Sequence, residues 1–389
     1  MSPSLGLSRH AVLAGLLAAF VGFASSFAVV LRGLAAMGAS PAQAASGLMA
    51  LSVAMGVCAI VLSLWRREPI SVAWSTPGAA LLASSAMPEG GFPAAVGAFL
   101  ASGALIVLAG MWRPLGRAVA AIPASLANAM LAGVLLGLCL APVRAVAALP
   151  GLALPVVLVW AVVWRFRRLY AVPAAVAAMG ALLAAGGGGT GAVRWFAEPL
   201  LVAPAWSPPA LIGLALPLFL VTMASQNIPG MAVLAVNGYR PPAGPLFRVT
   251  GLFTLLAAPF GGHAVNLAAI TAALCAGPNA HPDPARRYWA AVVAGAGYIA
   301  FGLLAGGATG LIAVSPPVLI EAVAGLALLG ALGGALSGAV AEAEGREAAL
   351  ITFLVTASGL TFLGVSGAFW GLLAGGAMRA LTRWRPGGT

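Results

Sequence analysis

The sequence predicts an all-α polytopic membrane protein with about 14 transmembrane segments in two inverted seven-segment repeats. Hydrophobic residues make up 62% of the 389 residues and charged residues only 7%, whereas soluble domains carry about 25% charged residues. Uncharged apolar runs of about 18 or more residues recur, which is the length that crosses a hydrocarbon core. A stretch near residue 123 also recurs near residue 316, about half a chain further on.

Cutting the chain at arginines, prolines and polar clusters gives fourteen segments. The first apolar run, from about Ala11 to Leu31, is too long for the core of a signal peptide, so we expect an uncleaved first span. The segments start near residues 9, 44, 70, 92, 116, 147, 169, 210, 245, 263, 288, 316, 347 and 366.

The distribution of arginine predicts the topology. All nineteen basic residues are arginines near predicted span ends, so the net charge of +11 does not indicate a nucleic-acid partner. With the N-terminus in the cytoplasm, sixteen arginines fall inside and only Arg32, Arg144 and Arg194 fall outside. This bias predicts a multi-pass protein of the lipid bilayer with both termini in the cytoplasm.

The third segment contains a broken stretch, "ISVAWSTPGAAL", from Ile70 to Leu81. Its first half favours a strand. Ser75 and Thr76 can cap a helix, and Pro77 suits the first helical position. Because irregular backbone at membrane depth must be buried in protein or line a cavity, the stretch predicts a short strand and a half-helix at a functional site.

A second broken stretch, "PFGGHAVNLAAITAAL" (259–274), lies in the tenth segment, and we align its Asn266 with Thr76. "PASLANAMLAGVLLG" (123–137) matches "PPVLIEAVAGLALLG" (316–330) at six of fifteen positions with an offset of 193 residues, which sets Asn128 opposite Glu321. Seven is odd, so the second half must be inverted. Broken segments at matching places indicate a transporter site at the midplane, and two half-helix N-termini there would attract an anion.

Three blocks of sequence resemble the benzoate/proton symporter (BenE-type) family of bacterial inner membranes, and the likeness extends over essentially the whole chain. These blocks are "PISVAWSTPGAALLASS", "SQNIPGMAVLAVNGYRPP" and "FGGHAVNLAAITAALCAGPNAHPDPARRYWAAV". The family resembles the uracil and sulphate carriers, in which segments 1–4 and 8–11 form a core domain and segments 5–7 and 12–14 form a gate domain. The resemblance implies a small aromatic carboxylate and protons as partners, and it leaves a homodimer open.

On this resemblance the chain divides into five parts. The core domain takes residues 8–111 and 210–313, and the gate domain takes residues 112–190 and 314–385. Residues 191–209 form an outer linker. Substrate is expected where the strands and half-helices of segments 3 and 10 meet.

The candidate substrate-binding residues combine polar groups for a carboxylate with apolar walls for a ring. Each also has a purely structural interpretation: helix capping, hydrogen bonding to a neighbour, or bonding to its own helix backbone. The candidates are Trp74, Ser75, Thr76, Pro77, Gly78, Gln226, Asn227, His263, Asn266, Phe27, Ser26, Phe260 and Met223.

Two residues are candidates for carrying the coupled proton. His263 has a side chain that titrates near neutral pH, and Glu321 is the only acid placed well inside a span, where a lone charge is costly. The uracil carriers place acids in segments 8 and 10. Here those segments carry Gln226, Asn227, His263 and Asn266 instead, so the proton route cannot be transferred from those relatives.

The favoured function is proton-coupled uptake of benzoate or a similar aromatic carboxylate by alternating access. The alternatives are a carrier of the same fold for another organic anion or a nucleobase, an uncoupled anion channel or uniporter, and a non-transporting scaffold. We expect no cofactor, no metal site and no enzyme activity, because His281 and Asp283 are too few ligands and no catalytic set is present. Three cysteines in apolar runs predict no disulfide: Cys58, Cys139 and Cys275.

Overall fold

The computed structural model describes residues 8–112, 114, 117, 122–185, 195–268, 270–313, 315–362 and 365–383. The first half contains α1 (Arg9–Ala24), α2 (Phe27–Ala36), α3 (Pro41–Arg66), β1 (Val72–Trp74), α4 (Thr76–Ser84), α5 (Gly91–Met111), α7 (Ala124–Cys139), α8 (Ala141–Ala148), α9 (Pro150–Phe166) and α10 (Ala171–Ala185).

The second half begins with one long, irregular helical segment: α11 (Pro208–Ala210), a π-helical turn η2 (Leu211–Ala215), α12 (Leu216–Thr222), a second π-helical turn η3 (Met223–Asn227) and α13 (Ile228–Val236). It continues with α14 (Ala243–Ala257), β2 (Val265–Leu267), α15 (Ile270–Ala276), α16 (Tyr288–Leu303), α17 (Ala305–Ala313), α18 (Pro317–Ala339), α19 (Arg346–Ala357), β3 (Thr361–Phe362), β4 (Val365–Ser366) and α20 (Gly367–Arg383).

The fourteen predicted segment starts agree with observed element starts to within three residues, except in segment 5. There α7 begins at Ala124 rather than near residue 116, and the preceding residues lie largely outside the described ranges. Among the described residues, eight helices are long and apolar enough to cross a membrane, or nine if the pair bent by 55° at Leu304 is one span. The remaining segments are α9, α19, α20 and the two half-helices α4 and α15.

The internal repeat is present in the element order. Val72 and Val265 begin β1 and β2 and lie 193 positions apart, as do Ala124 and Pro317, which begin α7 and α18. The same shift superimposes α3, α4 and α5 on α14, α15 and α16 in chain order. Since β1 and β2 are equivalent strands and pair antiparallel, the two halves are inverted relative to each other, as predicted.

Small residues allow the helices to approach closely. A Cβ atom added to Gly56 of α3 would lie 2.5 Å from the carbonyl oxygen of Gly295 on α16, so these two backbones are in direct contact. Close approach through small residues is the usual way in which helices associate in lipid. The three cysteines are buried and free, as predicted.

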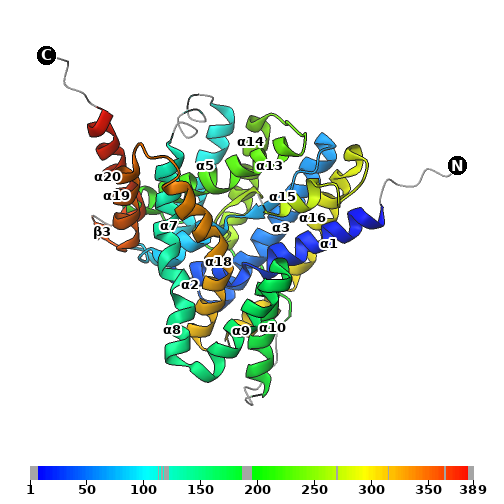
Figure 1. The fold of residues 1–389 in the computed structure, drawn as a ribbon. Helices are drawn as coiled ribbons and strands as arrows, with labels where there is room; N and C mark the ends of the chain where they lie inside the picture. The colour runs from blue at the N-terminus through cyan, green and yellow to red at the C-terminus, as the bar shows by residue number, and fades with distance from the viewer. Residues whose placement is uncertain are drawn as a thin grey trace.

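The strongest contacts between helices divide them into two groups. The core set comprises α1–α5 and α11–α17, in which α3 packs on α16 and α5 on α14. The gate set comprises α7–α10 and α18–α20, in which α7 packs on α18 and α19. In Figure 1 the labels α5, α13 and α14 lie at the top, with the end of α20 at the upper left and the start of α1 at the right, and we call this upper side the terminal side. The turn between α8 and α9 lies at the bottom, which we call the linker side. The predicted domain limits at residues 190 and 191 lie outside the described residues.

Candidate functional site

The centre of the core set is a two-stranded antiparallel ladder. Its register pairs Val72 with Leu267, Ala73 with Asn266 and Trp74 with Val265. A ladder this short is not stable alone, and here its alternate side chains are buried among the surrounding helices. The half-helices α4 and α15 leave from opposite ends of the ladder, so both of their positive N-terminal ends lie beside it.

Ser75 joins three elements at the start of α4. Its Oγ accepts hydrogen bonds from the Gly78 backbone N–H and the Thr222 hydroxyl, both at 3.0 Å. Its carbonyl oxygen accepts a hydrogen bond from His263 Nε2 at 2.9 Å. A Cβ atom added to Gly78 would lie 2.6 Å from Leu218 Cδ1 and 2.7 Å from Ser75 Oγ, so Gly78 permits both the cap and the packing of α12. Sequence reasoning missed Thr222, because a lone threonine in an apolar run carries no special signal.

The capping predictions need three corrections. Ser75 is the N-cap of α4, so Thr76 is its first helical residue and Pro77 its second. Asn266 caps no helix, because it lies inside β2 and α15 begins at Ile270. The offset of 193 makes Asn266 the equivalent of Ala73, its partner in the ladder, and not of Thr76. Thr76 is half-buried, whereas Ser75, Pro77 and Gly78 are buried.

Trp74 lies in a cluster of aromatic side chains. Its Nε1 donates a hydrogen bond of 2.9 Å to Ser26 Oγ, which itself donates to the Gly22 carbonyl oxygen. The ring centroid of Phe23 lies 5.6 Å from that of Trp74 and 5.7 Å from that of Phe27. Phe23 was not among the predicted residues, although its spacing of four from Phe27 is the signal that could have found it. Phe301 of α16, 5.2 Å from Phe23, completes this aromatic cluster.

The second π-helical turn of segment 8 supports the ladder. Asn227 is fully buried; its Oδ1 accepts the Leu267 N–H at 2.9 Å, and its Nδ2 donates to Met223 Sδ at 3.2 Å. Both ends of the amide are therefore engaged, and Asn227 acts as a positioning residue for β2. Gln226 is half-buried and makes no side-chain hydrogen bond to a described residue. π-Helical turns of this kind are frequent at functional sites.

Two buried polar atoms beside the ladder have no hydrogen-bond partner. His263 is fully buried between the Ser75 carbonyl group and the ring of Phe99, and its Nδ1 is unpaired. Because a carbonyl oxygen only accepts, Nε2 must carry the hydrogen and Nδ1 must be the bare acceptor. Asn266 Nδ2 donates to the Leu267 carbonyl oxygen, which leaves its Oδ1 unpaired. Such orphaned atoms at a candidate site require an explanation.

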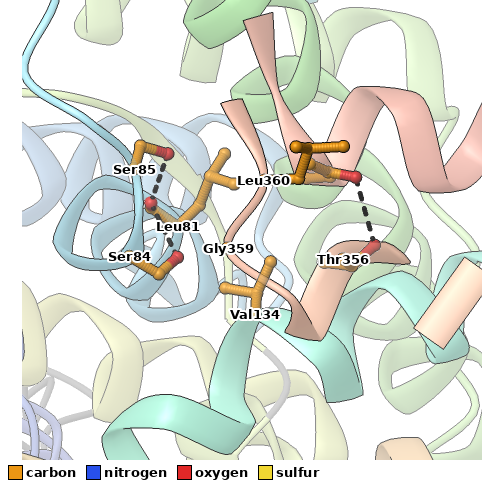
Figure 2. A pocket seen from close by; sticks show the side chains of 9 residues that line it. Leu81, Ser84, Ser85, Val134, Thr356, Gly359 and Leu360 are labelled. Atoms are coloured by element: carbon orange, nitrogen blue, oxygen red, sulfur yellow. Dashed lines mark hydrogen bonds between the residues drawn. The ribbon is translucent and has the colours of Figure 1, made fainter. Parts of the chain in front are cut away.

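Three cavities lie near these residues. On the terminal side, a cavity of about 850 Å³ is bounded by α5, segment 8, α14 and Arg117, and Met223 contributes to its wall. A second cavity, of about 20 Å³, lies between α4 and the gate set; Figure 2 shows Leu81 and Ser84 facing Val134 and Thr356 across it. We call these the terminal-side cavity and the α4–gate gap.

The predicted place of Phe260 in a wall of the site stays a prediction, because the structure puts this residue beside a different cavity. Phe260 lines the third cavity, of about 280 Å³, between α3, α14 and Pro199. None of the other predicted site residues lines that cavity.

Glu321 is not a lone charge inside the membrane, as the cost of such a charge leads one to expect. Its Oε1 lies 2.8 Å from Nη2 of Arg32, so the carboxylate is paired. Glu321 belongs to α18 of the gate set and Arg32 to α2 of the core set. Of the described residues, no three from His, Cys, Asp and Glu gather where they could hold a metal ion.

Comparison with known proteins matches nearly the whole chain to one family. A sequence profile described as "Benzoate membrane transport protein" matches residues 6–381. The chain is 44% identical to the inner membrane protein YdcO of Escherichia coli over 371 residues, covering 94% of each chain. It is 35% identical to the benzoate membrane transport protein of Acinetobacter baylyi over 371 residues, covering 95% of this chain and 94% of that protein.

Two solved structures share the fold. The transmembrane domain of the cyanobacterial bicarbonate transporter BicA aligns with a TM-score of 0.60 and 14% identity over 96% of each chain. SLC26A9 aligns with a TM-score of 0.64 and 12% identity over 95% of this chain and 65% of its own. These neighbours confirm the predicted inverted-repeat fold with a core and a gate.

Proposed function

Because this chain belongs to the benzoate membrane transport protein family, we propose that it takes up benzoate or a similar aromatic carboxylate together with a proton. The chain is a multi-pass membrane transporter, and its family and fold are those of transporters rather than enzymes. The name of the Acinetobacter relative supports the cargo. The name of the Escherichia relative supports the inner membrane as the location.

The observation that carries this proposal is the uneven burial of the ladder and half-helix α4. From Ser71 to Ala80, only Ala73 and Thr76 are incompletely buried. Thr76 therefore offers a hydroxyl and a helix N-terminus to a carboxylate, as suits an anion. The aromatic cluster behind Trp74 would form the apolar wall for the ring, and the terminal-side cavity would be the route to the cytoplasm.

We place the coupled proton on Nδ1 of His263. Protonation would put a positive charge next to the N-terminus of α4, and the positive end of the helix dipole there disfavours that charge. A carboxylate bound at the same place would attract the charge and so favour protonation. Proton and benzoate would then each favour binding of the other, and linkage requires this effect to be reciprocal.

An uncoupled carrier is the second candidate. It is favoured by the absence of Asp and Glu from segments 8 and 10 of the sequence. The pairing of Glu321 with Arg32 also removes the other expected proton carrier from the site.

Uptake of labelled benzoate into proteoliposomes separates the two candidates. With an acidic exterior and the membrane potential clamped, a symporter loads the liposomes with benzoate faster than protein-free liposomes fill, and the latter report passive diffusion of benzoic acid. An uncoupled carrier only brings the internal benzoate concentration to the external one.

Thr76→Val, which preserves the shape of the side chain and removes the hydroxyl, should weaken benzoate binding by roughly tenfold, since a bond to a charged ligand contributes about 1.5–3 kcal/mol. Unchanged affinity would move the carboxylate away from Thr76.

The proposed orientation places both termini in the cytoplasm. A cysteine at Arg144, exposed on α8 at the linker side, should react with an impermeant reagent from outside whole cells. A cysteine at Pro282, between α15 and α16, should not. The reverse pattern would invert the topology.

A further inference from the structure

The ion pair between Arg32 and Glu321 connects the core set to the gate set, and the proposed transport route does not use it. The Arg32 side chain is 38% exposed and the Glu321 side chain 31% exposed. Neither α2, α18 nor the adjacent α7 carries another charged residue. On these three helices the pair therefore has no other charged neighbour, and Nε of Arg32 is buried without a hydrogen-bond partner.

The pair joins the two groups of helices on one side of the molecule. Glu321 lies just after the start of α18 at Pro317, and α18 begins on the linker side and packs against α2 (Figure 1). The α4–gate gap has a volume of only about 20 Å³, which is room for about one water molecule. The terminal-side cavity of about 850 Å³ lies at the opposite side. Core and gate are therefore in contact through the ion pair on the linker side, while the large cavity lies on the terminal side.

Alternating access requires these two sides to exchange. When the core set shifts against the gate set, a contact that spans them on the linker side must break. A half-exposed ion pair suits this use, because such pairs are weak and are readily replaced by water. Removing one partner leaves the other charge uncompensated in apolar surroundings.

We propose that Arg32 and Glu321 form an ionic latch between core and gate, closed in the state seen here and broken when the linker side opens. The latch assigns a transport role to Arg32. It goes beyond the proposed function, because it holds for any cargo and for coupled or uncoupled transport.

Charge reversal tests the latch. Arg32→Glu and Glu321→Arg each place two like charges next to each other. The double variant restores the attraction with the two charges exchanged. The reporter is a cysteine in place of Met231, a half-buried residue on the wall of the terminal-side cavity. The three native cysteines are buried, so labelling by a maleimide in detergent reports this site.

We expect each single variant to slow labelling at least threefold, because loss of the latch favours the state in which the terminal side is closed. The double variant should return to within twofold of the parent. Arg144→Glu is the matched control, since it changes an exposed arginine of the linker side that forms no ion pair with a described residue. Its labelling should match the parent.

Single variants that label like the parent, or a double variant that fails to recover, would overturn the proposal. If a charge reversal prevents folding, the double variant Arg32→Gln/Glu321→Gln can be tested instead, because it leaves no unpaired charge. It should also slow labelling of the cysteine at position 231, but by a smaller factor. Parental labelling in a folded neutral pair would equally refute the latch.

Discussion

Replacing Ser75 with alanine removes the hydroxyl that connects the first turn of α4 to α12. The lost N-cap bond to Gly78 costs about 1 kcal/mol. The Thr222 hydroxyl is then left without its acceptor at a fully buried position, which costs about 1–3 kcal/mol. A threonine can turn to a carbonyl of its own helix, so we expect a total loss of stability of about 2–3 kcal/mol.

Benzoate binding should weaken as well, because the first turn of α4 would lose the contact that orients it. A share of about 1.4 kcal/mol in binding would correspond to a tenfold rise in Kd. Thermal unfolding followed by tryptophan fluorescence measures the first effect, and isothermal titration with benzoate measures the second. Adding Thr222→Val to Ser75→Ala should destabilise by less than the sum of the single changes, because the two hydroxyls share a bond.

Ser52→Ala is the matched control for this experiment. Ser52 is also fully buried, but its hydroxyl bonds only the Leu48 carbonyl oxygen of its own helix at 2.7 Å. That variant should keep the parental affinity for benzoate. If Ser75→Ala binds benzoate as tightly as the Ser52 control, α4 does not contact the carboxylate and the reasoning fails.

Three further predictions follow from contacts of the described residues. Asn227→Leu should lose about 1–3 kcal/mol of stability and weaken benzoate binding, because the buried Leu267 N–H loses its acceptor; a fully active variant would rule out a positioning role. Phe260→Leu should leave affinity within twofold in titrations, since Phe260 lines a separate cavity; a large loss would return it to the site. Burial raises the pKa of the Glu68 carboxyl above its usual value, against the effect of nearby Arg66. The Glu68 contribution to stability is thus lost as pH rises through that pKa, and Glu68→Gln should melt higher than the parent at neutral pH but not at acidic pH.

The span pattern and the broken third segment could be predicted because they depend on local sequence. Long uncharged runs specify helices in lipid, and a β-branched run followed by Ser, Pro and Ala specifies a strand and then a helix. The tenth segment was harder to predict. Asn266 resembles a cap in sequence, but it occupies the middle of a strand whose neighbours Val265 and Leu267 are buried on the other face. The helix begins only after the strand has ended.

Contacts between distant residues could not be predicted from a single sequence. Arg32 and Glu321 lie 289 positions apart, and the sequence around either residue does not indicate which residue pairs with it. Phe260 is close to His263 in the chain, yet Gly261 between them adopts φ +91°, so the chain reverses direction and Phe260 lines the cavity beside α3. The residue types in this stretch also did not indicate that Thr76 would be half-buried while its neighbours Ser75 and Pro77 are buried.

The measurement that tests coupling most directly is pH-gradient-driven accumulation of benzoate in proteoliposomes that contain the parent or His263→Gln, run beside benzoate exchange at equal pH. Exchange moves no net proton, so we predict that the variant keeps exchange and loses accumulation, while the parent performs both. The histidine has no bonding partner at Nδ1, and glutamine can still donate to the Ser75 carbonyl oxygen. A His263→Gln protein that accumulates benzoate as the parent does would contradict the assignment of the coupled proton to His263.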